Sequence, residues 1–295
     1  LQPDRKSYGA RERVSSKRES LSSSEHLRGS AICSDDQQTL DRLANWPISG
    51  IGLHPGGSNY VFVIRLTDPN KYHPESSGEE QADIEESASI YGIYKPQSGE
   101  RPLKDFPGGT LHKRERAAYL VSAELGWPRV PATVIRNGPH GEGSVQLFID
   151  AAIDDDEPDA EPANFFSLRD ERLNDFRDMA MFDVLLHNAD RKGGSCIVDE
   201  TGAIWAIDHG LTFNQMARRR TVMFEFNGTE YPESLVNDVR ALLSSIESKS
   251  ELSKELGDLL AQQEIDDLVT RAKEMIELGH YPMLDPTINV PWPMV

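Results

Sequence analysis

Two short acidic motifs on either side of a predicted strand pair constrain this 295-residue chain most. The first, Asp-Arg-Lys-Gly-Gly-Ser, begins at Asp190, and the second, Asp-His-Gly, begins at Asp208. Between them lie the apolar runs Cys196–Val198 and Ala203–Ile207, joined by a four-residue link that ends in glycine. This pattern predicts a hairpin of two short strands. The hairpin would bring the two aspartates together, as a site that binds a divalent metal and activates a hydroxyl requires.

A glycine-containing turn precedes these motifs in the chain. Residues 48–64 predict a strand, a turn and a second strand, with the sequence His-Pro-Gly-Gly-Ser-Asn at the turn. Glycines let a backbone approach a phosphate closely, and serine and asparagine add hydrogen-bond donors. Gly57, Ser58 and Asn59 therefore form a candidate phosphate-covering loop. A Gly-Gly turn is also an ordinary way to close a hairpin, so the loop gains its meaning from its order with the other motifs.

A lysine at a strand end and a glutamate on a helix form a candidate ion pair. Lys95 follows the apolar run Ile-Tyr-Gly-Ile-Tyr, and Glu115 lies in a helical pattern over residues 111–126 that Gly126 ends. Glu115 shares its face of that helix with three apolar residues, Leu111, Ala118 and Leu125. Because an unpaired buried carboxylate is costly, Lys95 is its expected partner. The alternatives are a solvent-facing lysine and a glutamate paired with Arg114 or His112.

The remaining pattern predicts two lobes that share a cleft. Further strands are expected at residues 130–135 and 143–150, and helices at residues 169–187, 233–247 and 251–279. Residues 282–295 are rich in proline, and Trp292 is expected to dock this extended tail on the body. The expected organisation is a disordered tail (residues 1–34), a first lobe (35–150) with an acidic insertion at 68–89, and a helical second lobe (151–295) that carries both motifs.

The order of Asp-x-Lys, a strand pair and Asp-x-Gly is that of kinase active sites. In detail, Asp-Arg-Lys-Gly-Gly-Ser and Ile-Asp-His-Gly resemble the phosphatidylinositol 3- and 4-kinases and the HipA-type bacterial kinases. They are most similar to a bacterial, largely actinobacterial family described as phosphatidylinositol 3/4-kinase-related, and the similarity covers roughly residues 35–295. The resemblance implies an α+β, two-lobed, atypical protein-kinase-like fold with an antiparallel sheet in the first lobe and a mainly helical second lobe.

The resemblance also implies roles for individual residues. Lys95 would hold the phosphates of ATP, Glu115 would position Lys95, and Asp208 would bind Mg²⁺, or Mn²⁺ in its place. Asp190 would accept or orient the proton of the substrate hydroxyl, and Lys192 would neutralise charge on the transferred phosphoryl group. Three residues near the end of the last expected strand of the first lobe would line the adenine hinge: Leu147, Phe148 and Ile149.

One position departs from the kinase pattern. Kinases usually have an asparagine five residues after the catalytic aspartate, as a second metal ligand, and here that position is Ser195. A serine hydroxyl can bind Mg²⁺, but it is shorter than an amide and is aimed differently. Asn188 could substitute from the other side of Asp190. The departure leaves open whether one metal or two bind, and it keeps a pseudokinase among the alternatives.

Charge and composition limit which molecules could accept the phosphate and where in the cell the protein is expected. The formal net charge of −18 argues against a nucleic-acid partner and against attraction to an anionic membrane. No apolar run is long enough to span a bilayer, no secretory leader is recognisable, and the two cysteines have no metal-ligand spacing, so cytoplasm is the expected location. We expect ATP- and Mg²⁺-dependent transfer of the γ-phosphate to a hydroxyl on protein Ser/Thr or a small molecule, in preference to a lipid. The alternatives are a nucleotide-binding pseudokinase that signals by docking and AMP transfer on the same fold.

Overall fold

A five-stranded antiparallel sheet forms the first part of the protein. The computed structural model describes residues 34–54, 59–72, 88–152 and 162–295. The strand order is β1-β2-β3-β5-β4. The strands are β1 (Ile48–Leu53), β2 (Phe62–Thr67), β3 (Ser89–Pro96), β4 (Thr133–Gly138) and β5 (Gly141–Leu147). All five strands were predicted, although the fourth begins three residues later than expected and turns directly into β5, with Gly138 opposite Gly141.

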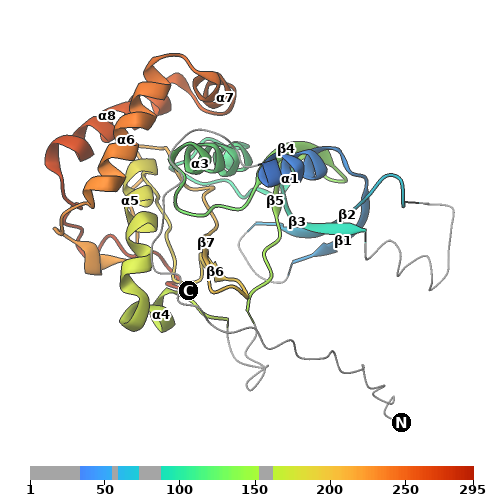
Figure 1. Cartoon of the computed structure of the whole chain (residues 1–295), viewed down its shortest axis with the longest axis horizontal. Coiled ribbons are helices and arrows are strands. Elements are labelled where there is room, and N and C mark those ends of the chain that lie inside the picture. The colour runs from blue at the N-terminus through green and yellow to red at the C-terminus, as the bar shows by residue number, and fades with distance from the viewer. Residues whose placement is uncertain (1–33, 55–58, 73–87, 153–161) are drawn as a thin grey trace, which may run out of the picture.

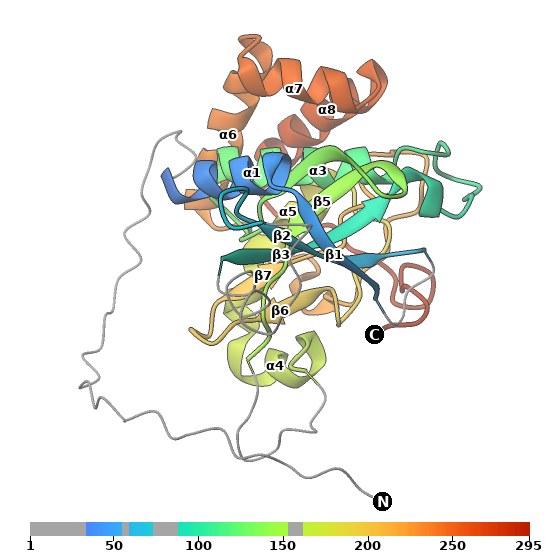
Figure 2. The same cartoon turned by 90° about the vertical axis from the view of Figure 1, so that its right-hand side faces the viewer.

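Two helices pack against the β4–β5 side of the sheet, α1 (Ser34–Asn45) and α3 (Leu111–Leu125) (Figure 2). Alternation along β3 buries Tyr94 completely in the core, and it turns Lys95 to the opposite face of the strand. α3 ends as predicted at Gly126, which adopts the left-handed conformation with φ of 78° and donates its N–H to the carbonyl of Ser122. The short 3₁₀ turn η1 (Gln97–Gly99) follows β3.

The second part of the protein is mainly helical and lies on the other side of α3 from the sheet (Figure 1). Its helices are α4 (Phe165–Arg172), α5 (Arg177–Leu186), α6 (Glu233–Glu247), α7 (Glu251–Leu259) and α8 (Gln262–Leu278). The predicted hairpin is present as β6 (Cys196–Val198) and β7 (Ile204–Ala206). Two 3₁₀ turns complete the part, η2 (Leu173–Phe176) and η3 (Phe224–Phe226).

Two of the predicted helices are divided in the structure. The helix expected at 169–187 begins earlier, where the Asn164 side chain accepts from the N–H groups of Phe166 and Ser167, and η2 then separates α4 from α5. The helix expected at 251–279 is interrupted between α7 and α8, where the carboxylate of Glu264 accepts from the Ala261 N–H and starts a new helix. The apolar spacing continues across both breaks, so it did not reveal them.

The C-terminal segment runs back across the helical part and ends beside α4 and the hairpin (Figure 1). The prediction that Trp292 docks this segment is wrong, because that side chain is 87% exposed. Hydrogen bonds attach the segment instead. The Met294 carbonyl accepts from Gly193 N–H at 2.7 Å, the Asn289 carbonyl accepts from Thr221 N–H at 2.8 Å, and the Asn289 side chain donates to the Arg219 carbonyl at 2.8 Å.

The parts of the chain that the structure describes contain no helix that combines the length and the apolar character needed to cross a membrane. The proposed tail and most of the acidic insertion at 68–89 lie outside the described residues. The proposed boundary between the lobes at residue 150 stays a prediction.

Candidate functional site

Lys95 stands between two carboxylates where the sheet meets the helical part. Its Nζ lies 2.6 Å from Glu115 Oε1 and 2.7 Å from Asp208 Oδ1. The Glu115 side chain is 5% exposed, whereas that of Asp208 is 55% exposed. β3, α3 and the segment after β7 each supply one member, so three elements far apart in the sequence meet at one ammonium group. The predicted Lys95–Glu115 pair is therefore present.

The two alternative partners of Glu115 are occupied elsewhere. Arg114 Nη2 donates to Glu264 Oε1 at 2.6 Å, and the His112 ring contacts Glu100 Oε1 at 2.9 Å. The second carboxylate oxygen of Glu115 accepts instead from the backbone N–H of His209 at 3.0 Å. Glu115 thus holds both Lys95 and the Asp-His-Gly motif.

Charge pairing sets the protonation of this cluster. Burial disfavours the Lys95 ammonium, but the carboxylates of Asp208 and Glu115 outweigh that effect and raise its pKa. The Lys95 ammonium likewise lowers the pKa of the Asp208 carboxyl. Asp208 adopts a left-handed backbone with φ of 60°, a conformation that non-glycine residues rarely take. An outlier of this kind at a predicted metal ligand fits the frequent clustering of backbone strain at functional sites.

Asp190 lies in the loop after α5. Its backbone N–H donates to the Asn188 side-chain oxygen at 2.9 Å, and its carboxylate lies 3.7 Å from Lys192 Nζ. Both side chains are about one quarter exposed, 28% for Asp190 and 27% for Lys192. Burial, assisted by the negative charge of Asp208, raises the Asp190 pKa even though Lys192 and Arg220 oppose the shift. Asp190 therefore has the environment of a proton acceptor rather than of a fully stabilised anion.

Arg191 is the central hydrogen-bond donor of the loop, and the sequence reasoning missed it. The side chain is fully buried, and all five of its N–H groups have acceptors. Nε and Nη2 form a forked pair with the Asp183 carboxylate at 2.7 and 2.9 Å. The other acceptors are the carbonyls of Ser195 and Ile207 and the Nε2 atom of His209. Arg191 thereby joins the Asp190 loop to the hairpin and to the Asp208 motif.

A sequence signal for this network was available. Asp183 lies on the otherwise apolar stripe of α5 and is 4% exposed. The argument that gave Glu115 a cationic partner applies equally to Asp183. Arg191 is the first arginine or lysine that follows Asp183 in the chain.

His209 is the neutral member of the Asp-His-Gly motif. Because Arg191 donates to its Nε2, its proton is on Nδ1, which is buried and has no acceptor among the described residues. Burial and the adjacent Arg191 charge lower the pKa of this histidine well below its ordinary range. Its ring packs edge-on against Phe182 of α5 at 5.5 Å between centroids.

The two residues considered as a second metal ligand are both buried in the protein. Ser195 is 3% exposed, and its carbonyl accepts from Arg191. Asn188 is 1% exposed; its amide donates to Asp183 and its oxygen accepts from Asp190 N–H. The described residues contain no group of three or more His, Cys, Asp or Glu side chains arranged to hold a metal ion. A metal bound here would therefore take Asp208 as its main protein ligand.

The predicted phosphate-covering loop and adenine hinge differ in how much of each the structure describes and in which backbone groups are already hydrogen-bonded. Gly57 and Ser58 lie outside the described residues, while the Asn59 side-chain oxygen accepts from Arg101 N–H at 2.9 Å. In the predicted hinge, the N–H of Leu147 bonds to Ala132 and that of Phe148 to Tyr91. Of the three hinge residues, only Ile149 has a backbone N–H without an acceptor in the described part of the chain.

Solved structures with similar folds include kinases. The Golgi casein kinase has a TM-score of 0.51 and 16% identity over 84% of this chain and 75% of that chain. The same kinase with Mn/ADP bound has a TM-score of 0.50 and 17% identity, over 82% of this chain and 75% of that chain. Hydra Fam20 with sugar also has a TM-score of 0.50, with 15% identity over 84% of this chain and 88% of that chain. These likenesses show the two-lobed, atypical kinase-like fold.

No family model matches the chain. It is, however, 35% identical over 232 residues to Protein Rv2133c of Mycobacterium tuberculosis, a match that covers 70% of this chain and 83% of that protein. The narrower resemblance to phosphatidylinositol 3/4-kinases and HipA stays a prediction. The chain therefore has a kinase-like fold, and by sequence it belongs to the family of the mycobacterial protein Rv2133c.

Proposed function

We propose that this protein is an ATP- and divalent-metal-dependent phosphotransferase that moves the γ-phosphate of ATP to a hydroxyl group. The observation that carries the proposal is the position of Lys95 Nζ, within 2.7 Å of both Glu115 and Asp208. A lysine that is fixed by a helix glutamate and lies beside a metal-binding aspartate is the arrangement that protein kinases use for phosphoryl transfer. It supplies positioning and charge stabilisation, on which this reaction mainly depends.

Each charged residue has a separate task in this proposal. Lys95 holds the phosphates, and Glu115 keeps it in place. Asp190, with a raised pKa, orients the acceptor hydroxyl and takes its proton. Lys192, 3.7 Å from Asp190, offsets the negative charge of the transferred phosphoryl group. Arg191 acts through Asp183 and His209 as a positioning residue.

The residues present fit one divalent metal ion. Asp208 is more than half exposed, and Lys95 occupies only one of its carboxylate oxygens. Mg²⁺ is commonly held by one or two carboxylates together with phosphate oxygens and water, so a single aspartate is a sufficient protein anchor. The metal would supply charge neutralisation at the phosphates. The similar kinase solved with Mn/ADP makes Mn²⁺ a natural second ion to test.

A protein Ser/Thr or a small soluble molecule is the acceptor that we favour. The formal charge of −18 opposes close approach to an anionic lipid surface. One of the similar solved structures is named as a casein kinase, which supports a protein acceptor. Ile149 is the hinge residue that we assign to adenine, since the N–H groups of its two predecessors are engaged in the protein.

A nucleotide-binding pseudokinase is the second candidate. Ser195 and Asn188 favour it, because both are buried and Asn188 is bound to Asp183 and Asp190. A site with one metal ligand could bind nucleotide without efficient transfer. Lys95, Asp190 and Asp208 are nevertheless all present, with Lys95 in contact with Asp208.

The test uses ATP labelled separately at its γ- and α-phosphates, with Mg²⁺ or Mn²⁺ and a panel of protein and small-molecule acceptors. Wild type is compared with Asp190→Ala and Asp208→Ala, and with Asp170→Ala as a control on a 91% exposed aspartate of α4. We expect γ-label transfer that falls at least about 100-fold in the first two variants and is unchanged in the control.

Other outcomes separate the alternatives. Transfer of the α-label would identify AMP transfer. ATP-dependent thermal stabilisation without movement of either label would favour the pseudokinase. If ATP neither binds nor reacts with either metal, the assignment of the site is wrong.

A further inference from the structure

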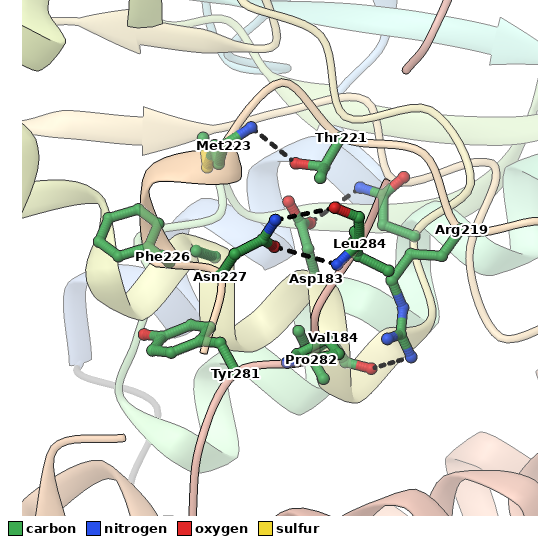
Figure 3. A pocket seen from close by; sticks show the side chains of 12 residues that line it. Asp183, Val184, Arg219, Thr221, Met223, Phe226, Asn227, Tyr281, Pro282 and Leu284 are labelled. Carbon is green, nitrogen blue, oxygen red and sulfur yellow. Dashed lines mark hydrogen bonds between the residues drawn. The ribbon is translucent and has the colours of Figure 1, made fainter. Parts of the chain in front are cut away.

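A cavity of about 120 Å³ lies between α5, α8 and the segments around residues 219, 231 and 280. Arg219 and Arg271 both line it, together with Tyr231, Glu274 and His280. A smaller neighbouring cavity shares Arg219, and Figure 3 shows the guanidinium of this residue reaching toward the Val184 carbonyl at the end of α5. No role in phosphoryl transfer is assigned to any of these residues.

Arg271 is buried with one nitrogen unused. It is 4% exposed, and its Nε and Nη1 donate to the Leu185 carbonyl at 2.9 Å and to Gln215 Oε1 at 2.7 Å. Its Nη2 is buried and has no hydrogen-bond partner in the described part of the molecule. A buried N–H group without an acceptor is costly, so an additional acceptor at this position would be favourable.

Arg219 is still less satisfied. Only its Nη2 has acceptors among the described residues, the Val184 carbonyl and His187 Nδ1, both at 3.3 Å. Its Nε is buried without a partner. Arg191 provides the contrast. All five of its N–H groups have acceptors, and the Asp183 carboxylate is its counter-charge.

The two guanidinium groups also lack close counter-charges. Neither has a carboxylate within 4.0 Å among the described residues. Burial lowers the pKa of both arginines, that of Arg271 to about 10, with the positive charge of Arg219 as the next cause for Arg271. The nearby carboxylates of Glu274 and Asp267 offset this only in part. A buried arginine and a partly buried one that line the same cavity favour an anion between them.

We propose that this cavity binds a tetrahedral oxyanion, namely a phosphate group, between Arg219 and Arg271. Guanidinium groups match phosphate oxygens in geometry and charge. A single water needs about 10–15 Å³ of such space, so a cavity of about 120 Å³ accommodates a phosphate group with room to spare. Arg219, Arg271 and Tyr231 all line the cavity and would donate to the phosphate oxygens, while the carboxylate of Glu274 in the same lining weakens the site.

The position of the cavity links it to the Asp190 loop. Arg220, the residue after Arg219, donates its N–H to the Asn188 carbonyl, and its own carbonyl accepts from Arg191 N–H. The Arg220 side chain also donates to the Ala189 carbonyl at 2.6 Å. An anion that fixes Arg219 therefore fixes a segment bonded on both sides of Asp190.

Isothermal titration with inorganic phosphate, in chloride buffer of constant ionic strength and without nucleotide, tests the proposal. We expect Arg219→Gln and Arg271→Gln each to weaken binding at least about tenfold. Arg218→Gln makes the same charge change at the exposed neighbouring position and is expected to leave the affinity within about twofold. Glu274→Gln should tighten binding, a gain that misfolding cannot produce.

A second arm separates the sources of the phosphate group. A phosphoserine peptide is titrated beside its unphosphorylated form: tighter binding than that of inorganic phosphate indicates a phosphorylated segment, and weaker binding indicates the free ion. Absence of phosphate binding would overturn the proposal. So would an affinity lost in Lys95→Met and retained in Arg219→Gln, since phosphate would then occupy the Lys95 site. None of these measurements needs turnover, so they remain informative if the proposed kinase activity fails.

Discussion

At the scale of single residues, three buried arginine and histidine side chains decide how the Asp190 loop is held. Arg191 uses every donor it has, with Asp183 as its counter-charge. His209 must stay neutral to accept from Arg191, and His187 must stay neutral to accept from Arg219. The loop is thus supported by neutral imidazoles that face guanidinium groups, an arrangement that protonation would disrupt.

His187 makes this dependence measurable. It is 8% exposed, its Nε2 donates to the Ala217 carbonyl, and burial lowers its pKa from 6.5 to about 4. The unfolded chain therefore binds a proton at this site near pH 6.5, while the folded chain does so only near pH 4. The stability that neutral His187 contributes is present above pH 6.5 and is lost as the pH falls toward 4, by about 3 kcal/mol in total.

Urea unfolding at about pH 7 and about pH 5 checks this prediction. We expect His187→Gln to reduce the fall in unfolding free energy between the two pH values by about 2 kcal/mol. Comparing the fall rather than the absolute value removes any constant cost of the substitution. A variant with the same pH dependence as wild type would contradict the assigned pKa. The ordinary pKa of a carboxyl group lies below this window, so aspartates and glutamates contribute little to the difference.

At the scale of elements, the sequence predicted most helices and strands, because neighbouring residues in the chain determine where such elements form and end. Apolar runs bounded by turn residues predicted the strands, and the apolar spacing before Gly126 predicted α3. The breaks after α4 and after α7 were missed, since an apolar stripe can continue through a short irregular turn. The metal role of Ser195 was predicted from its position in the motif, whereas its near-complete burial depends on the packing of the hairpin.

Two exposed glycines test the local cause of one helix end. Gly126 ends α3 with φ of 78°, while Gly257 lies inside α7, and an added Cβ would meet no atom within 4 Å at either position. We expect Gly126→Ala to destabilise the protein by about 1 kcal/mol, because alanine disfavours the left-handed conformation. Gly257→Ala should stabilise it by about 0.5–1 kcal/mol through helix propensity. Urea denaturation measures both, and shifts of the same sign would contradict the assigned backbone conformations.

At the scale of the whole molecule, α3 is the element that joins the sheet to the helical part. It packs on β4 and β5 and also against α6 and α7. Arg114, 1% exposed, donates to the Thr212 carbonyl at 2.7 Å and to Glu264 of α8 at 2.6 Å. The sequence could not identify this pair, because its members are 150 residues apart and neither lies in a motif. Glu115, the next residue, is therefore positioned by both parts of the fold.

A double-mutant cycle measures this connection. Arg114→Gln, Glu264→Gln and the double variant are compared by urea unfolding, with the neighbouring Arg116–Glu255 pair as the matched control. The first pair has side chains 1% and 14% exposed and the second 15% and 40%, so solvent screens the second pair more strongly. We expect a coupling energy of about 1.5–3 kcal/mol for Arg114–Glu264 and below about 1 kcal/mol for the control. Equal coupling in the two pairs would contradict a special role of the buried pair in fixing α3. Coupling confined to Arg114–Glu264, with Arg114→Gln also lowering phosphate transfer, would mean that the buried pair fixes α3 and thereby the position of Glu115 against Lys95.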